Sequence, residues 1–162
     1  MTQQNINENG LLNSRFLDKS YREAMELTED VASYLEQKNE KLRGFNLEVP
    51  SEVHYASESM RVSTCLMQVM SWFLVQKGVA SGEISKEEAG ALKFRLGAED
   101  ICLAKVDNRS GNLPETFVTF LEKSQNLYRQ VARMDRMVYG SRNKENPVHH
   151  LFEKLENKDI FE

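Results

Sequence analysis

The sequence contains little proline and glycine, and the positions of these residues restrict the fold. Three prolines and eight glycines are spread over 162 residues, and they leave three stretches with neither, residues 11–43, 51–77 and 115–139. A β-sandwich or barrel needs turn residues roughly every 8 to 12 positions, so spans of this length argue against that class. The length suits a single domain. We therefore expect an all-α protein built on three long helices.

Cysteines and long hydrophobic runs are also scarce. Cys65 and Cys102 have no CxxC or CxxH context, so the sequence indicates no disulfide framework. The most apolar stretch, residues 62–76, is shorter than the about 20 apolar residues of a membrane span and is interrupted by Ser, Thr and Gln. The first 16 residues lack the charged and apolar regions of a signal peptide. These absences predict a cytoplasmic protein that has no membrane partner.

Two of the three windows each carry one apolar stripe at steps of three and four residues, as expected for helices that pack in a bundle. In the first window, between an N-cap at Ser14 and a stop at Gly44, the stripe is Leu17, Tyr21, Ala24, Thr28, Val31 and Leu35. In the third window, between Pro114 and Gly140, it is Phe117, Phe120, Ser124, Leu127, Val131, Met134 and Val138. We predict three long antiparallel helices in a bundle, with one short extra helix and flexible termini.

The middle window has two apolar stripes instead of one. The first stripe is Val53, Ala56, Met60, Ser63, Met67, Met70 and Leu74. The second stripe is Tyr55, Val62, Leu66, Val69 and Phe73. A helix that is apolar on nearly all sides must be covered on more than one side. We therefore expect this helix to be central, and we predict a homodimer interface on the second stripe.

The remaining segments are expected to be short. Gly78 and Gly82 are predicted to end the second helix, and the capping-box sequence SKEE at 85–88 predicts a short helix over about 86–96. Residues 98–112 suggest a partial helix followed by a loop. The expected organisation is a flexible N-terminal lead over 1–13, a helical bundle domain over 14–140 and a C-terminal tail over 141–162.

The tail combines polar and apolar residues. Its apolar members are Leu151, Phe152, Leu155, Ile160 and Phe161. They are too many for a purely solvating tail and too few for a core of their own. The tail could serve as a peptide that binds a partner or as a strap that docks on the bundle, and the sequence leaves both interpretations open.

No group of residues indicates catalysis, a metal or a cofactor. His54 and Cys65 share a helix face but are separated by about 16 Å along the axis, too far for a base and its nucleophile. The adjacent His149 and His150 have no acidic or thiol partner at ligand spacing. The sequence contains neither a Walker loop nor a GxGxxG motif. We predict a protein that is not an enzyme and that needs no cofactor.

Two groups of charged residues are candidates for binding a partner. Glu58 and Arg61 can pair at i, i+3, either as an ordinary surface ion pair or as a partly desolvated contact to a partner or second copy. Arg129, Arg133 and Arg136 form a basic ridge on the third helix. The ridge lacks interleaved aromatic residues and the whole chain has a formal charge of −4, so an anionic protein fits better than nucleic acid.

Two segments resemble a known family. Residues 55–85, YASESMRVSTCLMQVMSWFLVQKGVASGEIS, resemble the signature region of the alphaproteobacterial family named after the regulator of CtrA degradation, RcdA. Residues 127–140, LYRQVARMDRMVYG, are similar to the third helix of that family, and the likeness covers roughly 14–140. It implies a dimeric three-helix bundle that serves as a non-enzymatic adaptor in cell-cycle control. The implied partners are the protease ClpXP primed by a response regulator, substrate proteins and other adaptors.

Two other functions are possible for a small helical bundle. A histidine phosphotransfer domain needs an exposed helical histidine, usually followed by Lys and Gly, whereas residues 55–58 after His54 are YASE. A nucleic-acid-binding bundle would use the arginines of the third helix and bind with a steep dependence on salt. Both remain alternatives to the adaptor interpretation.

Overall fold

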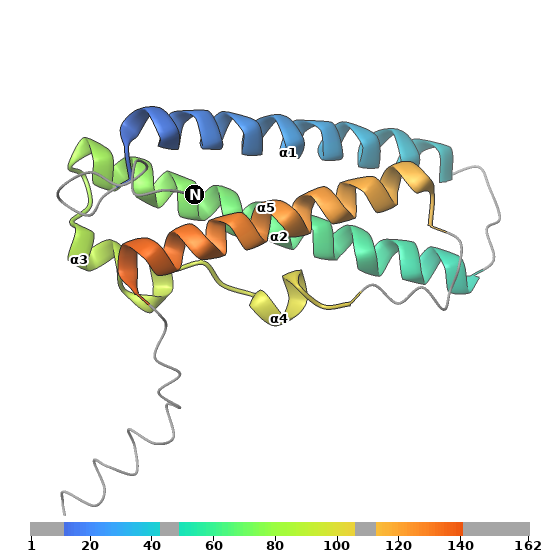
Figure 1. Cartoon of the computed structure of the whole chain (residues 1–162). Helices are drawn as coiled ribbons and strands as arrows, with labels where there is room; N and C mark the ends of the chain where they lie inside the picture. The colour runs from blue at the N-terminus through green and yellow to red at the C-terminus, as the bar shows by residue number, and fades with distance from the viewer. Residues whose placement is uncertain (1–11, 43–48, 106–112, 141–162) are drawn as a thin grey trace, which may run out of the picture.

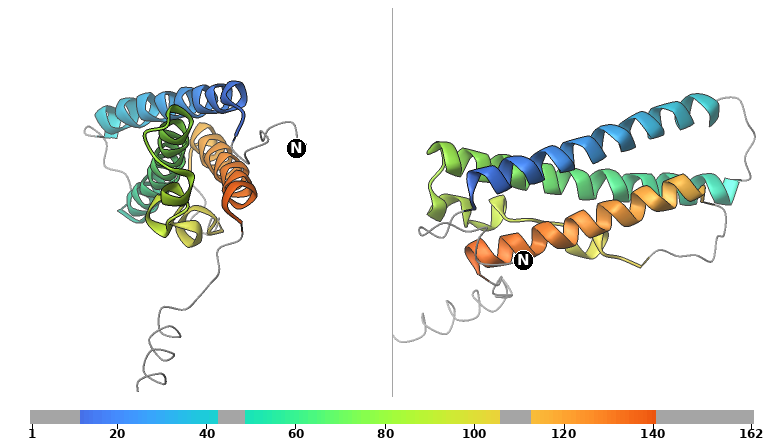
Figure 2. Two further views of the ribbon diagram at one scale, coloured as in Figure 1. Left: turned by 90° about the vertical axis from the view of Figure 1, so that its left-hand side faces the viewer. Right: turned by 45° about the horizontal axis from the view of Figure 1, so that its top comes forward.

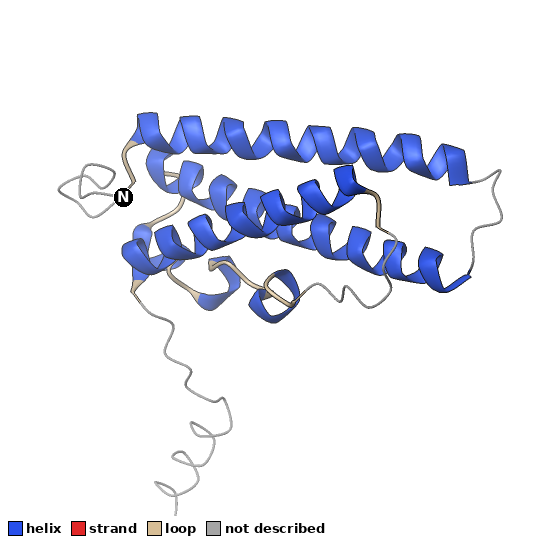
Figure 3. Cartoon of the chain, turned by 45° about the vertical axis from the view of Figure 1, so that its right-hand side comes forward, coloured by secondary structure: helices blue, strands red, loops and turns tan. Residues whose placement is uncertain are grey.

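Figure 1 shows a computed structural model of the chain, which describes residues 12–42, 49–105 and 113–140. Three long helices, α1 (Ser14–Leu42), α2 (Val49–Ser81) and α5 (Glu115–Tyr139), pack together. The connection from α2 to α5 contains two single-turn helices, α3 (Lys86–Ala89) and α4 (Glu99–Cys102), and the 3-10 turn η2 (Leu92–Phe94). The described residues form no strand, as Figure 3 shows. The predicted all-α bundle is confirmed.

The directions of the helices differ in one respect from the expected antiparallel arrangement. α1 runs opposite to its two neighbours, whereas α2 and α5 run the same way (Figures 1 and 2). Trp72 of α2 hydrogen-bonds Asp135 of α5, and one turn further along both helices Gln76 hydrogen-bonds Tyr139. Residue numbers therefore increase in the same direction along α2 and α5. The two helices can be parallel because the connection over residues 82–114 is long enough to return along the bundle.

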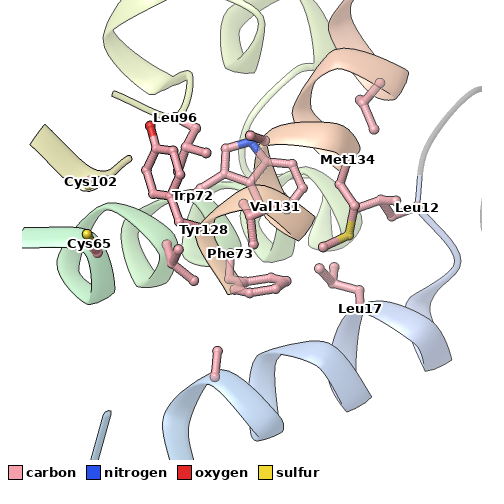
Figure 4. Close-up of a cluster of buried hydrophobic side chains, with 14 residues drawn as sticks. Leu12, Leu17, Cys65, Trp72, Phe73, Leu96, Cys102, Tyr128, Val131 and Met134 are labelled. Carbon is pink, nitrogen blue, oxygen red and sulfur yellow. The ribbon is translucent and has the colours of Figure 1, made fainter. Parts of the chain in front are cut away.

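α2 is the central helix, as the two apolar stripes predicted. It packs against α1, α5, α3, α4 and η2. Viewed end-on, α1 lies on one side of α2 and α5, and the connection with α3 and α4 lies on the other (Figure 2). The larger buried cluster joins all three long helices, and Figure 4 shows among its members Leu17, Trp72, Phe73, Tyr128, Val131 and Met134. Burial of these side chains supplies the main favourable free energy of the fold.

The ends of the long helices differ slightly from the predicted caps. Asn13, not Ser14, caps α1, because its Oδ1 accepts a hydrogen bond from the backbone N–H of Arg15 at 3.0 Å. α2 continues through Gly78 and ends before Gly82, which has a left-handed φ of 79°. Gly78 does not end the helix but allows the close approach of Ile84, because a Cβ at this position would lie 2.9 Å from Cδ1 of Ile84. Gly140 follows the last residue of α5, as predicted.

The connection from α2 to α5 is held by polar contacts that the sequence did not reveal. Ser85 caps the short helix as predicted, because its hydroxyl oxygen accepts a hydrogen bond from the backbone N–H of Glu88 at 3.1 Å. The helix ends at Ala89, however, and not near residue 96 as predicted. Further along, the backbone N–H of Gly97 donates to Gln68 of α2, and the hydroxyl of Tyr128 of α5 donates to the Gly97 carbonyl. These bonds fix the connection against both long helices and so determine where α4 lies.

Candidate protein-binding surfaces

The described residues contain no group of three or more His, Cys, Asp or Glu that could hold a metal ion. Cys65 of α2 and Cys102 of α4 are both buried in the larger core cluster. The interaction between the two thiols and their burial raise the pKa of Cys65, while the same interaction lowers the pKa of Cys102. The two thiols sit together in the core (Figure 4), where they pack as small apolar groups.

The stripe predicted as a dimer interface lies inside the single chain. Four of its members, Val62, Leu66, Val69 and Phe73, are buried, and Tyr55 is half-buried against Phe117 of α5. These side chains form the two core clusters together with α1 and α5. They are not available to a second copy unless the bundle opens. The assignment of this stripe to an interface between copies is therefore wrong.

The other stripe of α2 is the exposed one. Its large members lie one heptad apart, and the exposed fractions are 64% for Val53, 72% for Met60, 65% for Met67 and 56% for Leu74. The exposed residues of α2 from position 53 onward, including Ala56, Ser57, Ser63 and Ser71 between the large ones, carry no charge. We call the four large residues the α2 stripe. An uncharged row of large apolar side chains on a solvent-facing helix is typical of a protein-binding surface.

Glu58 and Arg61 form a buried ion pair and not a surface contact. Arg61 lies 2.8 Å from Glu58 Oε1, with side chains that are 15% and 4% exposed. A second guanidinium nitrogen of Arg61 donates to the carbonyl of Ala104, just after α4, and Gln125 of α5 donates to the same carbonyl. The pair therefore joins α2 to the α4 segment within one chain. Its role in binding a partner remains a prediction.

The three predicted arginines of α5 lie together on the surface. Arg129, Arg133 and Arg136 are exposed and line a cavity of about 450 Å³ between α4 and α5, whose other wall includes Glu99 and Leu103. We call this cavity the α4–α5 groove. Arg129 also donates to the neighbouring Asn126 at 2.9 Å. Three guanidinium groups beside one carboxylate make the groove basic on a chain that is acidic as a whole.

A second, acidic cavity lies on the adjacent face of α5, and Asn126 and Gln130 line both cavities. It has a volume of about 330 Å³ between α1 and α5, and its acidic lining residues are Glu23, Glu26 and Asp30. Lys123 of α5 is the basic residue among those that line it. The sequence alone could not reveal this cavity, because it forms only where α1 and α5 meet.

The remaining predicted partner-binding residues, Leu151, Phe152, Leu155, Ile160 and Phe161, lie outside the described residues. His54, the candidate of the phosphotransfer alternative, is half-buried near the beginning of α2. No helix among the described residues has the length and hydropathy to span a membrane.

Comparison with known proteins identifies the family. A family model described as "Protein of unknown function (DUF1465)" matches residues 8–158. The chain belongs to the DUF1465 family. It is also similar to the crystal structure of RcdA from Caulobacter crescentus CB15, with a TM-score of 0.63 and 32% identity over 80% of this chain and 95% of that chain. This likeness confirms the family resemblance drawn from the sequence. The curated proteins yield no match to this DUF1465 member.

Proposed function

We propose that this protein is a non-enzymatic adaptor of ATP-dependent proteolysis that acts with ClpXP in cell-cycle control. The observation that carries the proposal is the likeness to RcdA, at 32% identity over most of both chains. The partners we propose are the primed protease, substrate proteins and other adaptors, which follow from the family resemblance. The cytoplasm is the proposed location.

An adaptor needs binding surfaces and a rigid frame, not reactive groups. Tethering a substrate near a protease raises its local concentration to about millimolar, which accelerates degradation without any catalytic residue. The described part of the chain provides two surfaces of different character on one bundle, the uncharged α2 stripe and the basic α4–α5 groove. An apolar surface can join two copies of the chain, while the electrostatic surface of each copy stays accessible to another protein.

We further propose that the protein is a homodimer joined along the α2 stripe. The exposed residues Val53, Met60, Met67 and Leu74 repeat at the heptad interval, and Ala56, Ser63 and Met70 fill the intermediate positions of a coiled-coil pattern. This pattern supports packing of two α2 helices against each other. The small side chains at Ala56 and Ser63 allow close approach.

Reconstituted proteolysis tests the adaptor function. Degradation of CtrA, the substrate that the family name suggests, is followed with purified ClpXP and its priming response regulator, with and without this protein. We expect several-fold faster degradation with the protein present, and no change for a substrate that ClpXP degrades unaided. If no candidate substrate is degraded faster, the proposal is wrong.

Sedimentation tests the dimer. Met60→Glu combined with Met67→Glu places two charges on the α2 stripe and should convert a dimer into a folded monomer. Ser33→Glu, which adds a charge at an exposed position of α1, is the matched control and should leave the dimer intact. A wild-type protein that sediments as a monomer at tens of micromolar would contradict the dimer while leaving the adaptor function to the proteolysis assay.

A further inference from the structure

The α4–α5 groove is open, basic and partly apolar, which makes it suited to an acidic amphipathic segment. Arg129, Arg133 and Arg136 follow one another along one wall at i, i+4 and i+7. Within the part of the chain that the structure describes, none of the three forms an ion pair. Leu103 supplies an apolar surface, and Glu99 is the acidic residue on the α4 wall.

The tail has the complementary composition. Val148, Leu151, Phe152 and Leu155 are spaced at i, i+3, i+4 and i+7, the spacing of one apolar helix face. Residues 151–162 contain four carboxylates and two lysines, so this segment has a net charge of −2. On a helix, Glu153 and Glu156 fall on one side of the apolar face, whereas Lys154 and Lys158 fall on the other.

We propose that the C-terminal segment over residues 148–162 docks in the α4–α5 groove of its own chain. In this arrangement the apolar face of the segment covers the surface around Leu103. Its acidic side meets the three arginines of α5, and its lysine side meets Glu99 on α4. The segment lies antiparallel to α5, which places Val148 near Arg136 and Leu155 near Arg129.

The dimensions permit this arrangement. The arginine row from Arg129 to Arg136 and the apolar face from Val148 to Leu155 each span seven residues, or about 10 Å of helix. The chain leaves α5 at Gly140, one turn beyond Arg136, with a φ of 77° that redirects it away from the helix axis. The seven residues 141–147 reach about 24 Å when extended, enough to turn back onto the groove.

Attachment to the same chain makes a weak contact effective. A short tether gives the segment a local concentration of about 1 mM, so an intrinsic dissociation constant of about 100 µM leaves the groove about tenfold more occupied than empty. The docked tail would then exclude other acidic segments from the groove. Release of the tail would free both the groove and the apolar residues of the tail at the same time.

A competition experiment tests the proposal. The probe is a fluorescein-labelled peptide of residues 146–162, and its binding is measured by fluorescence anisotropy. The receptors are the full-length wild-type chain and a full-length variant whose tail carries Leu151→Ser, Phe152→Ser and Leu155→Ser. We expect the peptide to bind the tail variant about tenfold more tightly than wild type, because the wild-type tail competes for the groove.

Charge variants locate the binding site. In the tail-variant background, Arg133→Glu with Arg136→Glu should weaken peptide binding at least tenfold. Arg15→Glu with Arg22→Glu, two exposed arginines of α1, is the matched control and should leave binding unchanged. A peptide with Glu153→Lys and Glu156→Lys should regain binding to the Arg133→Glu/Arg136→Glu receptor, a rescue that a folding defect cannot produce.

Three outcomes overturn the proposal. They are failure of the peptide to bind the tail variant, equal binding to wild type and tail variant, and equal binding of an acidic peptide of unrelated sequence. The last outcome would instead assign the groove to acidic segments of other proteins. The assay contains no protease, so its result is independent of whether the adaptor function is correct.

Discussion

Arg95 and Asp135 form an ion pair that joins the connection between α2 and α5 to the centre of the bundle. Arg95 Nε lies 2.8 Å from Asp135 Oδ1, and each side chain is 5% exposed. Asp135 also accepts a hydrogen bond from the indole N–H of Trp72, while Arg95 donates to the carbonyl of Gly140. One carboxylate therefore links α2, α5 and the intervening connection.

Removing that carboxylate should destabilise the protein strongly. Asp135→Ala leaves the guanidinium of Arg95 buried without a counter-charge and the indole N–H of Trp72 without its acceptor. Breaking a buried pair in this way costs about 3–5 kcal/mol. Urea unfolding followed by circular dichroism measures the loss in the free energy of unfolding.

An exposed ion pair provides the control. Asp18 and Lys77 form an ion pair in which the side chains are 57% and 40% exposed. Asp18→Ala removes this contact and should lower the free energy of unfolding by less than about 1 kcal/mol. If the Asp18→Ala and Asp135→Ala variants lose similar stability, burial is not what makes the Asp135 pair important. A double variant, Arg95→Met with Asp135→Leu, should recover part of the stability, because no uncompensated charge remains.

Leucines on the two stripes of α2 should differ sharply in their contribution to stability. Leu66 is 3% exposed in the core and Leu74 is 56% exposed. Leu66→Ala leaves a cavity and should lower the free energy of unfolding by about 2–5 kcal/mol. Leu74→Ala leaves no cavity within a single chain and should cost under about 1 kcal/mol.

This comparison must be made at low protein concentration, where a dimer contributes nothing to the measured stability. The fluorescence of the single tryptophan, Trp72, follows unfolding under these conditions. Similar losses for Leu66→Ala and Leu74→Ala would mean that both stripes are buried in the monomer. A larger loss for Leu74→Ala would reverse the assignment of the two faces.

The two stripes also show how far the sequence alone could lead. Periodicity correctly identified three long helices and a central α2, because each spacing depends only on residues within one helix. It could not tell which stripe faces the core, since both are apolar and the answer depends on where α1 and α5 lie. The more aromatic and β-branched stripe, with Val62, Val69 and Phe73, is the one that the core uses.

Long-range polar contacts were beyond prediction for a different reason. Arg95 and Asp135 are 40 residues apart, and each looks like an ordinary surface residue in its own segment. Their pairing depends on α5 running parallel to α2, which the sequence did not indicate. The arginines of α5 were identified because their spacing within one helix sufficed, whereas the groove that they line required the position of α4.

Two tyrosine hydroxyls provide a matched test of hydrogen bonding. The hydroxyl of Tyr128 donates to the carbonyl of Gly97, whereas that of Tyr55 is buried with no hydrogen-bond partner among the described residues. Tyr128→Phe should therefore lower the free energy of unfolding by about 1 kcal/mol. Tyr55→Phe should leave it unchanged or raise it slightly, because the variant removes a buried polar group whose desolvation is not compensated. A clear loss for Tyr55→Phe would show that its hydroxyl is paired.

Alkaline pH should destabilise the bundle. Burial raises the pKa of Tyr55 and of Tyr139 above the usual 10.0, and the interaction with Cys102 together with burial raises that of Cys65 above 9.0. The opposite shift of Cys102 offsets part of the effect of Cys65. The folded chain therefore keeps protons that the unfolded chain releases, and the free energy of unfolding falls as pH rises above about 9–10. Below that range both states are protonated at the raised groups, which then add no dependence on pH.

The urea midpoint measured from about pH 8 to about pH 10.5 tests this expectation. We expect little change at the lower end and a progressive decrease at the upper end. Tyr55→Phe removes one of the groups responsible, so the decrease should be shallower in that variant than in wild type. A midpoint that stays constant up to pH 10.5, or a slope that Tyr55→Phe leaves unaltered, would show that Tyr55 ionises as readily in the folded chain as in the unfolded one.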